Sequence, residues 1–221
     1  MIEAAGLNKT FRSDGTETHA LRDVSLTIRD GEFVSIVGRS GSGKTTLLNV
    51  LSTLMSPDSG TIRFDGRETV SMSERDLNSL RKKDLAMVFQ FHYLLPYLTA
   101  VENVLLPFMS AMLPVGRDRT DHAARCLARV GLKGKENRLP GQLSGGEQQR
   151  VAIARALVTS AKVLFADEPT GSLDKTTGRE IMELIRGFTD DGLAVVMVTH
   201  DRDYAGVADR VISMEDGRIV A

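Results

Sequence analysis

The chain has 221 residues, which is enough for one large α/β domain that carries an inserted subdomain. Its formal net charge of −1 excludes a strong overall positive field of the kind that attracts proteins to nucleic acid. The hydrophobic fraction of 42% is ordinary for a soluble protein, and no apolar run approaches the roughly 20 residues of a membrane-spanning helix. The N-terminus shows no signal-peptide pattern. We therefore expect any membrane role to depend on a partner.

The first part of the chain, residues 2–28, contains short strand-like segments. Phe11 lies among them and fits a core or edge-strand position as well as it fits a ligand-stacking role. A turn at Asp30-Gly31 then leads into the apolar run 33–37, which predicts a buried strand. Leucines recur at helical spacing over residues 45–55, which predicts a helix directly afterwards.

A glycine-rich stretch joins this strand to this helix. It reads Gly38-Arg39-Ser40-Gly41-Ser42-Gly43-Lys44-Thr45-Thr46, and it fits the pattern of a phosphate-binding loop. Glycines let the backbone approach phosphate groups closely, and the following helix offers unpaired N–H donors. We expect Lys44 to reach the β- and γ-phosphates of a nucleotide and the Thr45 hydroxyl to bind Mg²⁺. A plain Gly/Ser turn with a chance lysine is the alternative, and it leaves the strand-to-helix context unexplained.

The next elements are short. A strand is predicted over 61–64 with a tight turn at Asp65-Gly66, a polar exposed helix over 73–83, and an apolar strand over 85–89 that ends at Gln90. Strand signals are then absent from 91 to 158, where helices are predicted over 99–112, 118–130 and 146–158. No Gly/Ser linker flanks this stretch, so residues 91–158 are expected to be a helical insertion into an α/β core formed by 1–90 and 159–221.

The single cysteine lies inside this helical stretch. Cys126 cannot form an intrachain disulfide, and a chain with one cysteine suits a reducing compartment. Because its neighbours have a helical pattern, we expect a buried structural thiol.

Apolar runs return near the C-terminus. Residues 163–166 and 193–198 predict buried strands, with a helix between them and a closing hairpin at Asp216-Gly217. Apolar runs that alternate with helices predict a mainly parallel sheet, whose ligands bind at the carboxyl ends of the strands. The side chains expected at this edge are those of Lys44, Gln90, Asp167, Glu168 and His200.

Two carboxylates follow the strand at 163–166. Asp167 is placed to hold Mg²⁺, and Glu168 to orient or deprotonate an attacking water, as phosphoryl transfer requires. A helix-cap or turn role would explain an isolated Asp-Glu pair before a proline. The phosphate-binding loop elsewhere in the chain favours catalysis.

A second glycine pair precedes the helix predicted over 146–158. In the run Leu143–Arg150, Ser144 is a good N-cap, and Gly145 and Gly146 leave the helix N-terminus open to an anion. Simple capping is the alternative. One helix N-terminus is already expected to bind the phosphates. A second exposed one therefore favours a second phosphate contact, and that contact can be made between subunits.

Six segments resemble, in content and order, the motifs of ATP-binding-cassette (ABC) ATPases. They are Gly38–Thr46, Gln90, Leu143–Arg150, Asp167–Glu168, Ser172–Asp174 and His200. The resemblance covers nearly the whole chain, and the Leu-Ser-Gly-Gly-Glu-Gln run is its most specific part. It implies an α/β phosphate-loop NTPase fold, with a mainly parallel core, an N-terminal antiparallel β subdomain and an inserted α-helical subdomain.

The resemblance also implies a head-to-tail homodimer. Each ATP would lie between the phosphate loop of one subunit and the signature of the other, which comprises Ser144, Gly145, Gly146 and Glu147. Asp174 would lie at the dimer seam, Gln90 would contact Mg²⁺ and the attacking water, and His200 would contact the γ-phosphate. Phe11 aligns with the aromatic residue that stacks on adenine. Many relatives have tyrosine there, so a hydroxyl contact is lost.

A narrower resemblance appears in residues 88–104, which are similar to the ATPase subunits of lipoprotein-releasing and macrolide-export systems. It favours a permease-docking role for Phe91, Tyr93, Leu94 and Leu95, because contiguous exposed apolar residues mark interfaces. The alternative is that these four residues are core. Two departures are mild: Ala161 stands where many relatives have proline, and Ser172 where many have asparagine.

These features predict an ATPase that uses ATP and Mg²⁺ to power a separate integral-membrane permease of the few-span exporter, lipoprotein-release or mechanotransmission type. The chain would sit peripherally, through the permease, at the cytoplasmic face of the cell membrane. A soluble ABC ATPase that acts on nucleic acid or ribosomes is the alternative, but the chain has no coiled-coil insertion, second cassette or basic arm. A non-hydrolysing switch is a third interpretation, which Lys44, Glu168 and His200 disfavour.

Overall fold

The computed structural model describes residues 1–13, 16–109 and 115–220. The strands are β1 (Ile2–Ser13), β2 (Thr16–Ile28), β3 (Phe33–Gly38), β4 (Ser59–Phe64), β5 (Arg67–Glu68), β6 (Leu85–Phe89), β7 (Val163–Asp167), β8 (Ala194–Val198), β9 (Arg210–Glu215) and β10 (Arg218–Ile219). The helices are α1 (Lys44–Leu51), α2 (Glu74–Lys83), α3 (Ala100–Leu105), α4 (Arg117–Arg129), α5 (Gly145–Leu157), α6 (Lys175–Thr189) and α7 (Arg202–Ala205), with 3₁₀ turns η1 (Leu106–Phe108) and η2 (Pro140–Gln142).

A mainly parallel sheet forms the centre of the molecule. Its strand order is β10-β9-β3-β8-β7-β6, and only the β9–β10 pair is antiparallel among the pairs described. Parallel sheets are covered on both faces, so their strands read as continuous apolar runs. The burial of Val34, Ile36, Phe165 and Val196 fits this rule, since each is fully buried. The prediction of a mainly parallel core is therefore confirmed.

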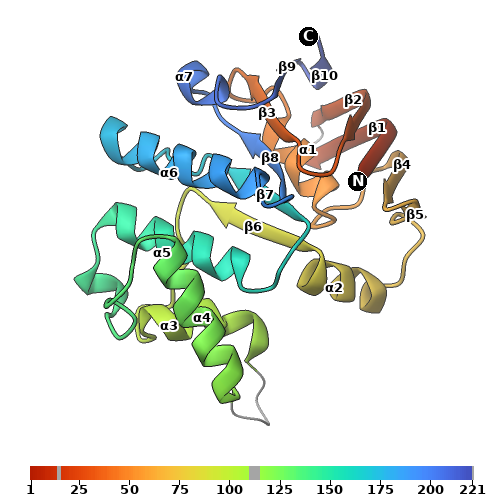
Figure 1. Ribbon diagram of the computed structural model, residues 1–221. Helices are drawn as coiled ribbons and strands as arrows, with labels where there is room; N and C mark the ends of the chain where they lie inside the picture. The colour runs from red at the N-terminus through yellow and green to blue at the C-terminus, as the bar shows by residue number, and fades with distance from the viewer. Residues whose placement is uncertain (14–15, 110–114, 221) are drawn as a thin grey trace.

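A second sheet packs beside the first. Its order is β2-β1-β4-β5, with antiparallel pairs throughout. Figure 1 shows it at the N-terminal side of the molecule, next to α1 and β3. Apolar residues of β1 and β2, such as Leu7 and Val24, join one buried cluster with those of α1 and the central sheet. The N-terminal antiparallel β subdomain implied by the family resemblance is present.

The stretch from α3 to α5 contains no strand within the described ranges. Figure 1 shows α3 and α4 at one end of the molecule, with α5 between them and α6. Leu127 of α4 and Ile153 of α5 belong to the same buried cluster as Leu164 of β7 and Ile185 of α6. The helical insertion and the central sheet share one buried apolar cluster. The predicted boundaries of the insertion, at residues 91 and 158, therefore stay a prediction.

Two helices are shorter than expected. The helix predicted over 45–55 ends at Leu51, after which Thr53 adopts a left-handed backbone with φ of 60°. The helix predicted over 99–112 ends at Leu105, and a 3₁₀ turn follows that contains Pro107. Proline has no N–H for an α-helical hydrogen bond, which explains the early end. Residues 110–112 of this prediction lie outside the described residues.

Asn103 of α3 holds the loop that leads into its own helix. Its side chain is fully buried. The amide Nδ2 donates to the carbonyl oxygens of Leu95, Leu98 and Thr99 at 3.1, 2.9 and 3.1 Å, and Oδ1 accepts from the Leu95 N–H at 2.8 Å. One side chain thus bonds four backbone groups of the segment 95–99. The carbonyls of Leu95 and Thr99 also accept backbone hydrogen bonds, whereas the Leu95 N–H and the Leu98 carbonyl depend on Asn103.

Asn103→Ala should therefore lower the free energy of unfolding by about 2–4 kcal/mol, because it removes these bonds and leaves buried groups unpaired. Asn78→Ala on the exposed face of α2 is the matched control and should cost less than about 1 kcal/mol. Chemical denaturation measures both values. Equal costs for the two variants would contradict the role given to Asn103.

Candidate nucleotide site

The phosphate-binding loop has a backbone that needs glycine at two positions. Gly41 and Gly43 have φ of 80° and 100°, in the left-handed region that other residues rarely adopt. A Cβ at Gly43 would also lie 2.2 Å from the carbonyl oxygen of Ala20. Lys44 begins α1 and is buried, and its Nζ donates to the carbonyl oxygens of Gly38 and Arg39 at 2.9 Å each. The loop is thus closed on the lysine that is expected to meet phosphates.

A cleft of about 580 Å³ lies over this loop. It is lined by Phe11, Thr18, Ala20, Ser40, Gly41, Gly43, Lys44, Thr45, Thr46, Glu168 and His200. Phe11 is 41% exposed on β1, so it is not a core residue. Its ring borders the same cleft as Lys44, where a planar apolar face can stack on a base. That stacking role stays a prediction.

Oxygen atoms suited to Mg²⁺ meet at one end of the cleft. The Thr45 hydroxyl donates to Oδ1 of Asp167 at 3.4 Å. Burial raises the pKa of the Asp167 carboxyl above its ordinary value, an effect that a bound cation would oppose. In the part of the chain that the structure describes, no group of three or more His, Cys, Asp or Glu side chains could hold a metal. Two protein oxygens nevertheless fit Mg²⁺, which takes its other ligands from substrate phosphates and water.

Glu168 and His200 form a pair beside this end of the cleft. Nδ1 of His200 lies 2.9 Å from Oε2 of Glu168. Glu168 has a left-handed backbone with φ of 48°, and its N–H donates to the carbonyl of Val198 on β8 at 2.9 Å. Non-glycine residues in this conformation cluster at functional sites, where the surroundings hold them. The pair is therefore positioned by the backbone of two neighbouring parallel strands.

Gln90 lies near the same carboxylate. A Cβ at Gly171 would be 2.8 Å from Nε2 of Gln90 and 3.2 Å from Oε2 of Glu168, so both side chains pass close to this glycine. Sequence reasoning missed Gly171. Its position shortly after the Asp-Glu pair could have indicated its role, because a glycine there leaves room for the side chains of Gln90 and Glu168.

The structure thus gathers the side chains expected at one edge of the sheet. Lys44, Gln90, Asp167, Glu168 and His200 all follow the carboxyl ends of β3, β6, β7 or β8. Their individual chemical roles stay predictions.

The signature helix α5 begins away from this cleft. Ser144 is its N-cap, with a hydroxyl that accepts from the Glu147 N–H at 3.3 Å and an N–H that donates to the Glu147 carboxylate at 2.8 Å. Lys135 pairs with Glu147 and lowers the pKa of that carboxyl. Capping is therefore real, but Ser144 and Gly145 are exposed and do not line the cleft of their own chain.

The two signature glycines face different surroundings. A Cβ at Gly146 would lie 2.3 Å from Thr177 of α6, so packing inside the chain demands glycine there. A Cβ at Gly145 would meet nothing closer than Leu173 at 3.6 Å, an ordinary contact. The fold of the single chain therefore does not explain Gly145.

Asp174, expected at a dimer seam, is the N-cap of α6. Its carboxylate accepts from the N–H groups of Thr176 and Thr177 at 3.0 Å, and these hydrogen bonds and that of the Thr177 hydroxyl lower the pKa of its carboxyl. Capping explains this aspartate within one chain. Its place at a seam stays a prediction.

The segment 91–97, here called the docking loop, exposes large side chains. Phe91, Tyr93, Leu95 and Tyr97 are 65%, 64%, 47% and 90% exposed. Leu94 differs, since it is partly buried and packs against the apolar core. Sequence reasoning missed Tyr97, although the apolar alternation through Pro96 pointed to it. It also missed Arg155 and Gln149 of α5, which contact this part of the chain.

A larger cavity, of about 840 Å³, lies away from these residues. It is bordered by α4, the end of α5 and the starts of β6 and β7, and Cys126 is in its lining. Cys126 is buried and forms no disulfide, and burial raises the pKa of its thiol, which agrees with a structural role. None of the phosphate-motif residues reaches this cavity. The phosphate-binding motif therefore favours the smaller cleft as the candidate nucleotide site.

The fold and the cleft together define a phosphate-loop nucleotide-binding domain. The ABC transporter family profile matches residues 21–171. The macrolide export ATP-binding/permease proteins MacB of Neisseria meningitidis serogroup B and of Nitrosomonas europaea are 46% and 47% identical to the chain over 223 and 222 residues. Each alignment covers all of this chain and 34% of the relative, so the chain spans about a third of the length of these proteins.

Solved structures agree. The post-hydrolysis dimer of the ATP-binding cassette MJ0796, bound to ADP and Pi, is 40% identical with a TM-score of 0.90, covering 100% of this chain and 97% of that one. The structure of cbiO1 from Clostridium perfringens, part of the transporter complex cbiONQ, is 32% identical with a TM-score of 0.88, covering 100% and 86%. The chain belongs to the ABC transporter family and is an ABC ATPase domain. The predicted resemblance is confirmed.

Glu168→Gln should keep ATP binding and lower turnover by about 10²- to 10⁴-fold, the usual contribution of a general base. An amide can accept a hydrogen bond from water but cannot take its proton. Steady-state phosphate release and nucleotide titration measure the two effects. Glu183→Gln, an exposed acid on α6, is the control. Unchanged turnover in Glu168→Gln would contradict the assignment.

Proposed function

We propose that the chain binds ATP with Mg²⁺ and hydrolyses it in a head-to-tail homodimer, and that dimer closure drives an integral-membrane permease. One observation carries the proposal. Lys44, Thr45 and the Glu168–His200 pair border one cleft, and Asp167 is hydrogen-bonded to Thr45. The capped N-terminus of α5 lies exposed outside this cleft.

Hydrolysis follows from the groups in the cleft. Lys44 and the N-terminus of α1 bind the phosphates, and Phe11 stacks on the base. Thr45 and Asp167 would hold Mg²⁺, which would offset phosphate charge. Glu168 accepts the proton of the attacking water, and His200 keeps that carboxylate oriented while its other ring nitrogen is left for the γ-phosphate. Gln90, whose side chain passes close to Gly171 as that of Glu168 does, helps to position the water.

Dimerisation follows from the signature. Gly145 presents an unpaired N–H group at the start of α5, beside the capped Ser144, and such a helix N-terminus binds anions. Since Gly145 is not required by its own chain, close approach of a group from outside explains it. The γ-phosphate held by a second copy supplies that group. The dimeric MJ0796 cassette, similar over its whole length, supports this arrangement.

Ser144→Arg should leave a monomer that binds ATP but does not dimerise on it, because the bulky cation blocks the helix N-terminus. Sedimentation of Ser144→Arg in the Glu168→Gln background, with and without ATP, measures this. Ser144→Thr keeps the cap and is the control that should still dimerise. An ATP-dependent dimer of Ser144→Arg would mean that the signature is only a cap.

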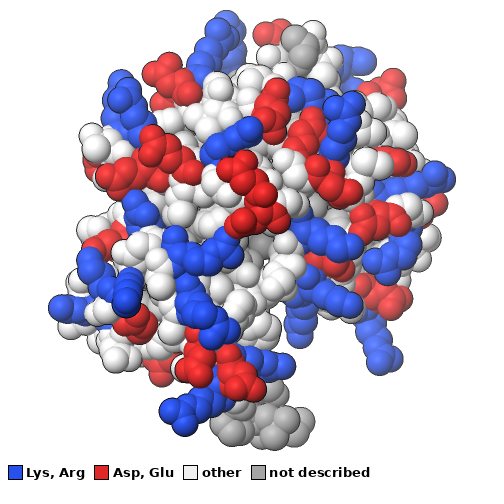
Figure 2. All heavy atoms as spheres, viewed as in Figure 1, with Lys and Arg blue, Asp and Glu red and all other residues white. Residues whose placement is uncertain are grey.

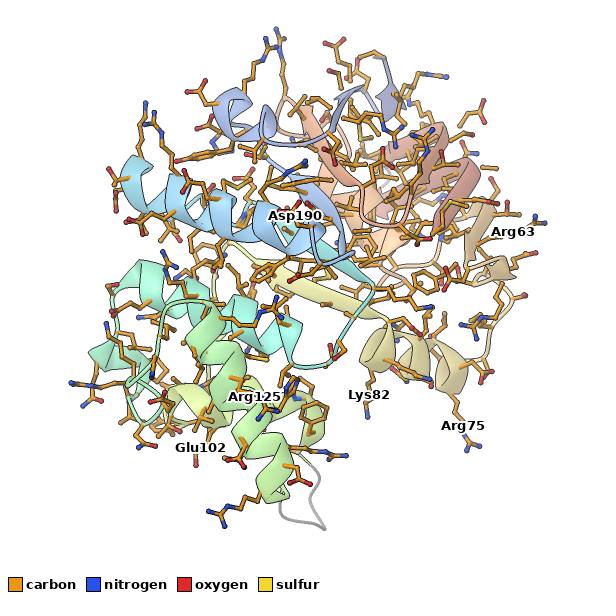
Figure 3. The ribbon with its side chains drawn as sticks, in the orientation of Figure 1. Arg63, Arg75, Lys82, Glu102, Arg125 and Asp190 are labelled. Carbon is orange, nitrogen blue, oxygen red and sulfur yellow. The ribbon has the colours of Figure 1, made fainter. Side chains whose placement is uncertain are left out.

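The docking loop supports a membrane partner. Arg155, which donates to its backbone, also lines a groove of about 260 Å³ between α2, β6 and the end of α5, to which Arg81, Lys82 and Pro107 contribute. Figure 2 shows the molecule hollowed near α2, and in Figure 3 Arg75 and Lys82 project from that helix. An apolar helix end with a carboxylate would fit this basic border. The described residues contain no helix long and apolar enough to cross a membrane.

Tyr93→Ala combined with Leu95→Ala should weaken permease association by about 2–4 kcal/mol, as truncation of interface anchors does. Basal ATP turnover of the chain should change little, because these side chains lie outside the nucleotide cleft. Pull-down with the permease and ATPase assays measure the two effects. Loss of basal turnover with permease association intact would show that the residues serve the core.

The kind of permease is also part of the proposal. The MacB relatives are named for macrolide export, and residues 88–104 resemble that group and the lipoprotein-releasing ATPases, so a few-span exporter or mechanotransmission permease is favoured. The chain would then lie peripherally at the cytoplasmic face of the membrane. Action on nucleic acid is disfavoured, because Figure 2 shows acidic and basic side chains interspersed over the visible face.

A further inference from the structure

Arg155 lies in the last turn of α5, and its side chain reaches the backbone of the docking loop. One guanidinium nitrogen donates to the carbonyl oxygen of Tyr93 at 2.8 Å and another to that of His92 at 2.9 Å. Among the ion pairs of the described residues, none includes Arg155. Burial lowers the pKa of its guanidinium, yet arginine stays charged in proteins. This partly buried cation is therefore bonded to two loop carbonyls.

The loop backbone is shaped to meet this cation. In an extended segment, successive carbonyls point to opposite sides, so one donor cannot reach two in a row. Tyr93 adopts a left-handed backbone with φ of 45°, which allows the carbonyls of His92 and Tyr93 to converge on one guanidinium. A tyrosine in this conformation is strained and persists only where its surroundings hold it. Arg155 supplies that restraint.

Other bonds tie both ends of the docking loop to neighbouring helices. Gln149, on α5, donates to the carbonyl oxygens of Pro169 at 2.6 Å and Phe89 at 3.5 Å, and Phe89 directly precedes Gln90. Asn103 of α3 holds Leu95. One helix, α5, thus carries the signature serine at its first end and the clamp on the docking loop at its last.

We propose that Arg155 is a positioning residue that fixes the docking loop to the signature helix, so that displacement of the loop and displacement of Ser144 are one motion. This inference rests on the proposed function, to which it adds a physical connection between the docking loop and the signature helix. Arginine suits the task because its planar fork holds two acceptors in a fixed geometry, whereas lysine offers a single mobile point charge.

The test is amide hydrogen exchange on the whole chain in the Glu168→Gln background, with and without ATP. In Arg155→Met, amides of residues 91–98 should exchange about 10- to 100-fold faster, as loss of charge-assisted hydrogen bonds predicts. Their protection should also stop responding to ATP. The helix 145–157 should keep its protection, and the dissociation constant for ATP should stay within about twofold, since Arg155 lies outside the nucleotide cleft.

Two further variants separate positioning from general stability. Arg155→Lys should recover part of the protection and part of the ATP response of the loop. Arg129→Lys, an exposed arginine of α4, should change neither. The proposal is overturned if the loop of Arg155→Met keeps its ATP response. It is also overturned if Arg155→Lys and Arg155→Met lose protection equally throughout α3 to α5, since Arg155 would then serve only folding.

The measurement uses ATP and no permease. Failure of the chain to associate with a permease would therefore leave this result intact. Failure of the exchange test would likewise leave the measured ATP turnover unaffected.

Discussion

The parallel alignment of four strands is the constraint on which the site depends. β3, β8, β7 and β6 lie side by side and run in the same direction, so the segments that follow them leave the sheet at one edge. Lys44, His200, Asp167 and Gln90 are far apart in the sequence, and this alignment alone brings them together. Apolar burial on both faces holds the strands. The site residues are therefore brought together by apolar strand residues that are not themselves part of the site.

The second sheet and the helical insertion add to this edge from opposite sides. β1 places Phe11 over the phosphate loop, at the end of the cleft where a base would lie. The insertion contributes α5, whose capped and exposed N-terminus does not line the cleft of its own chain. One chain thus carries both the cleft over the phosphate loop and an exposed helix N-terminus, and a head-to-tail pair of copies would bring the two together. The proposed dimer follows from the separation of the phosphate loop and the N-terminus of α5 on a single chain.

Much of this was predictable because local signals and tertiary packing agree. The phosphate loop, the strand ends and the signature cap depend on glycines, apolar runs and capping residues, which the sequence shows directly. The early end of α1 was missed because leucine spacing continued past it, and that of α3 because apolar residues continued past it, whereas Thr53 and Pro107 stop the helices. Leu94 was grouped with the exposed side chains of the docking loop, and its partial burial was not predicted, because exposure alternates along that loop. Arg155 was unpredictable, since its partners are backbone carbonyls some sixty residues away.

The position of Lys44 has a consequence for how the loop meets an anion. An ammonium group has three hydrogens, and two of them are bonded to the carbonyl oxygens of Gly38 and Arg39. Carbonyl oxygens carry partial negative charge and would repel a phosphate that entered the loop. By occupying them, Lys44 masks the acceptors of the loop while its N–H donors stay available. The loop therefore presents N–H donors rather than bare carbonyl oxygens, and these two bonds leave one hydrogen of the ammonium group unused.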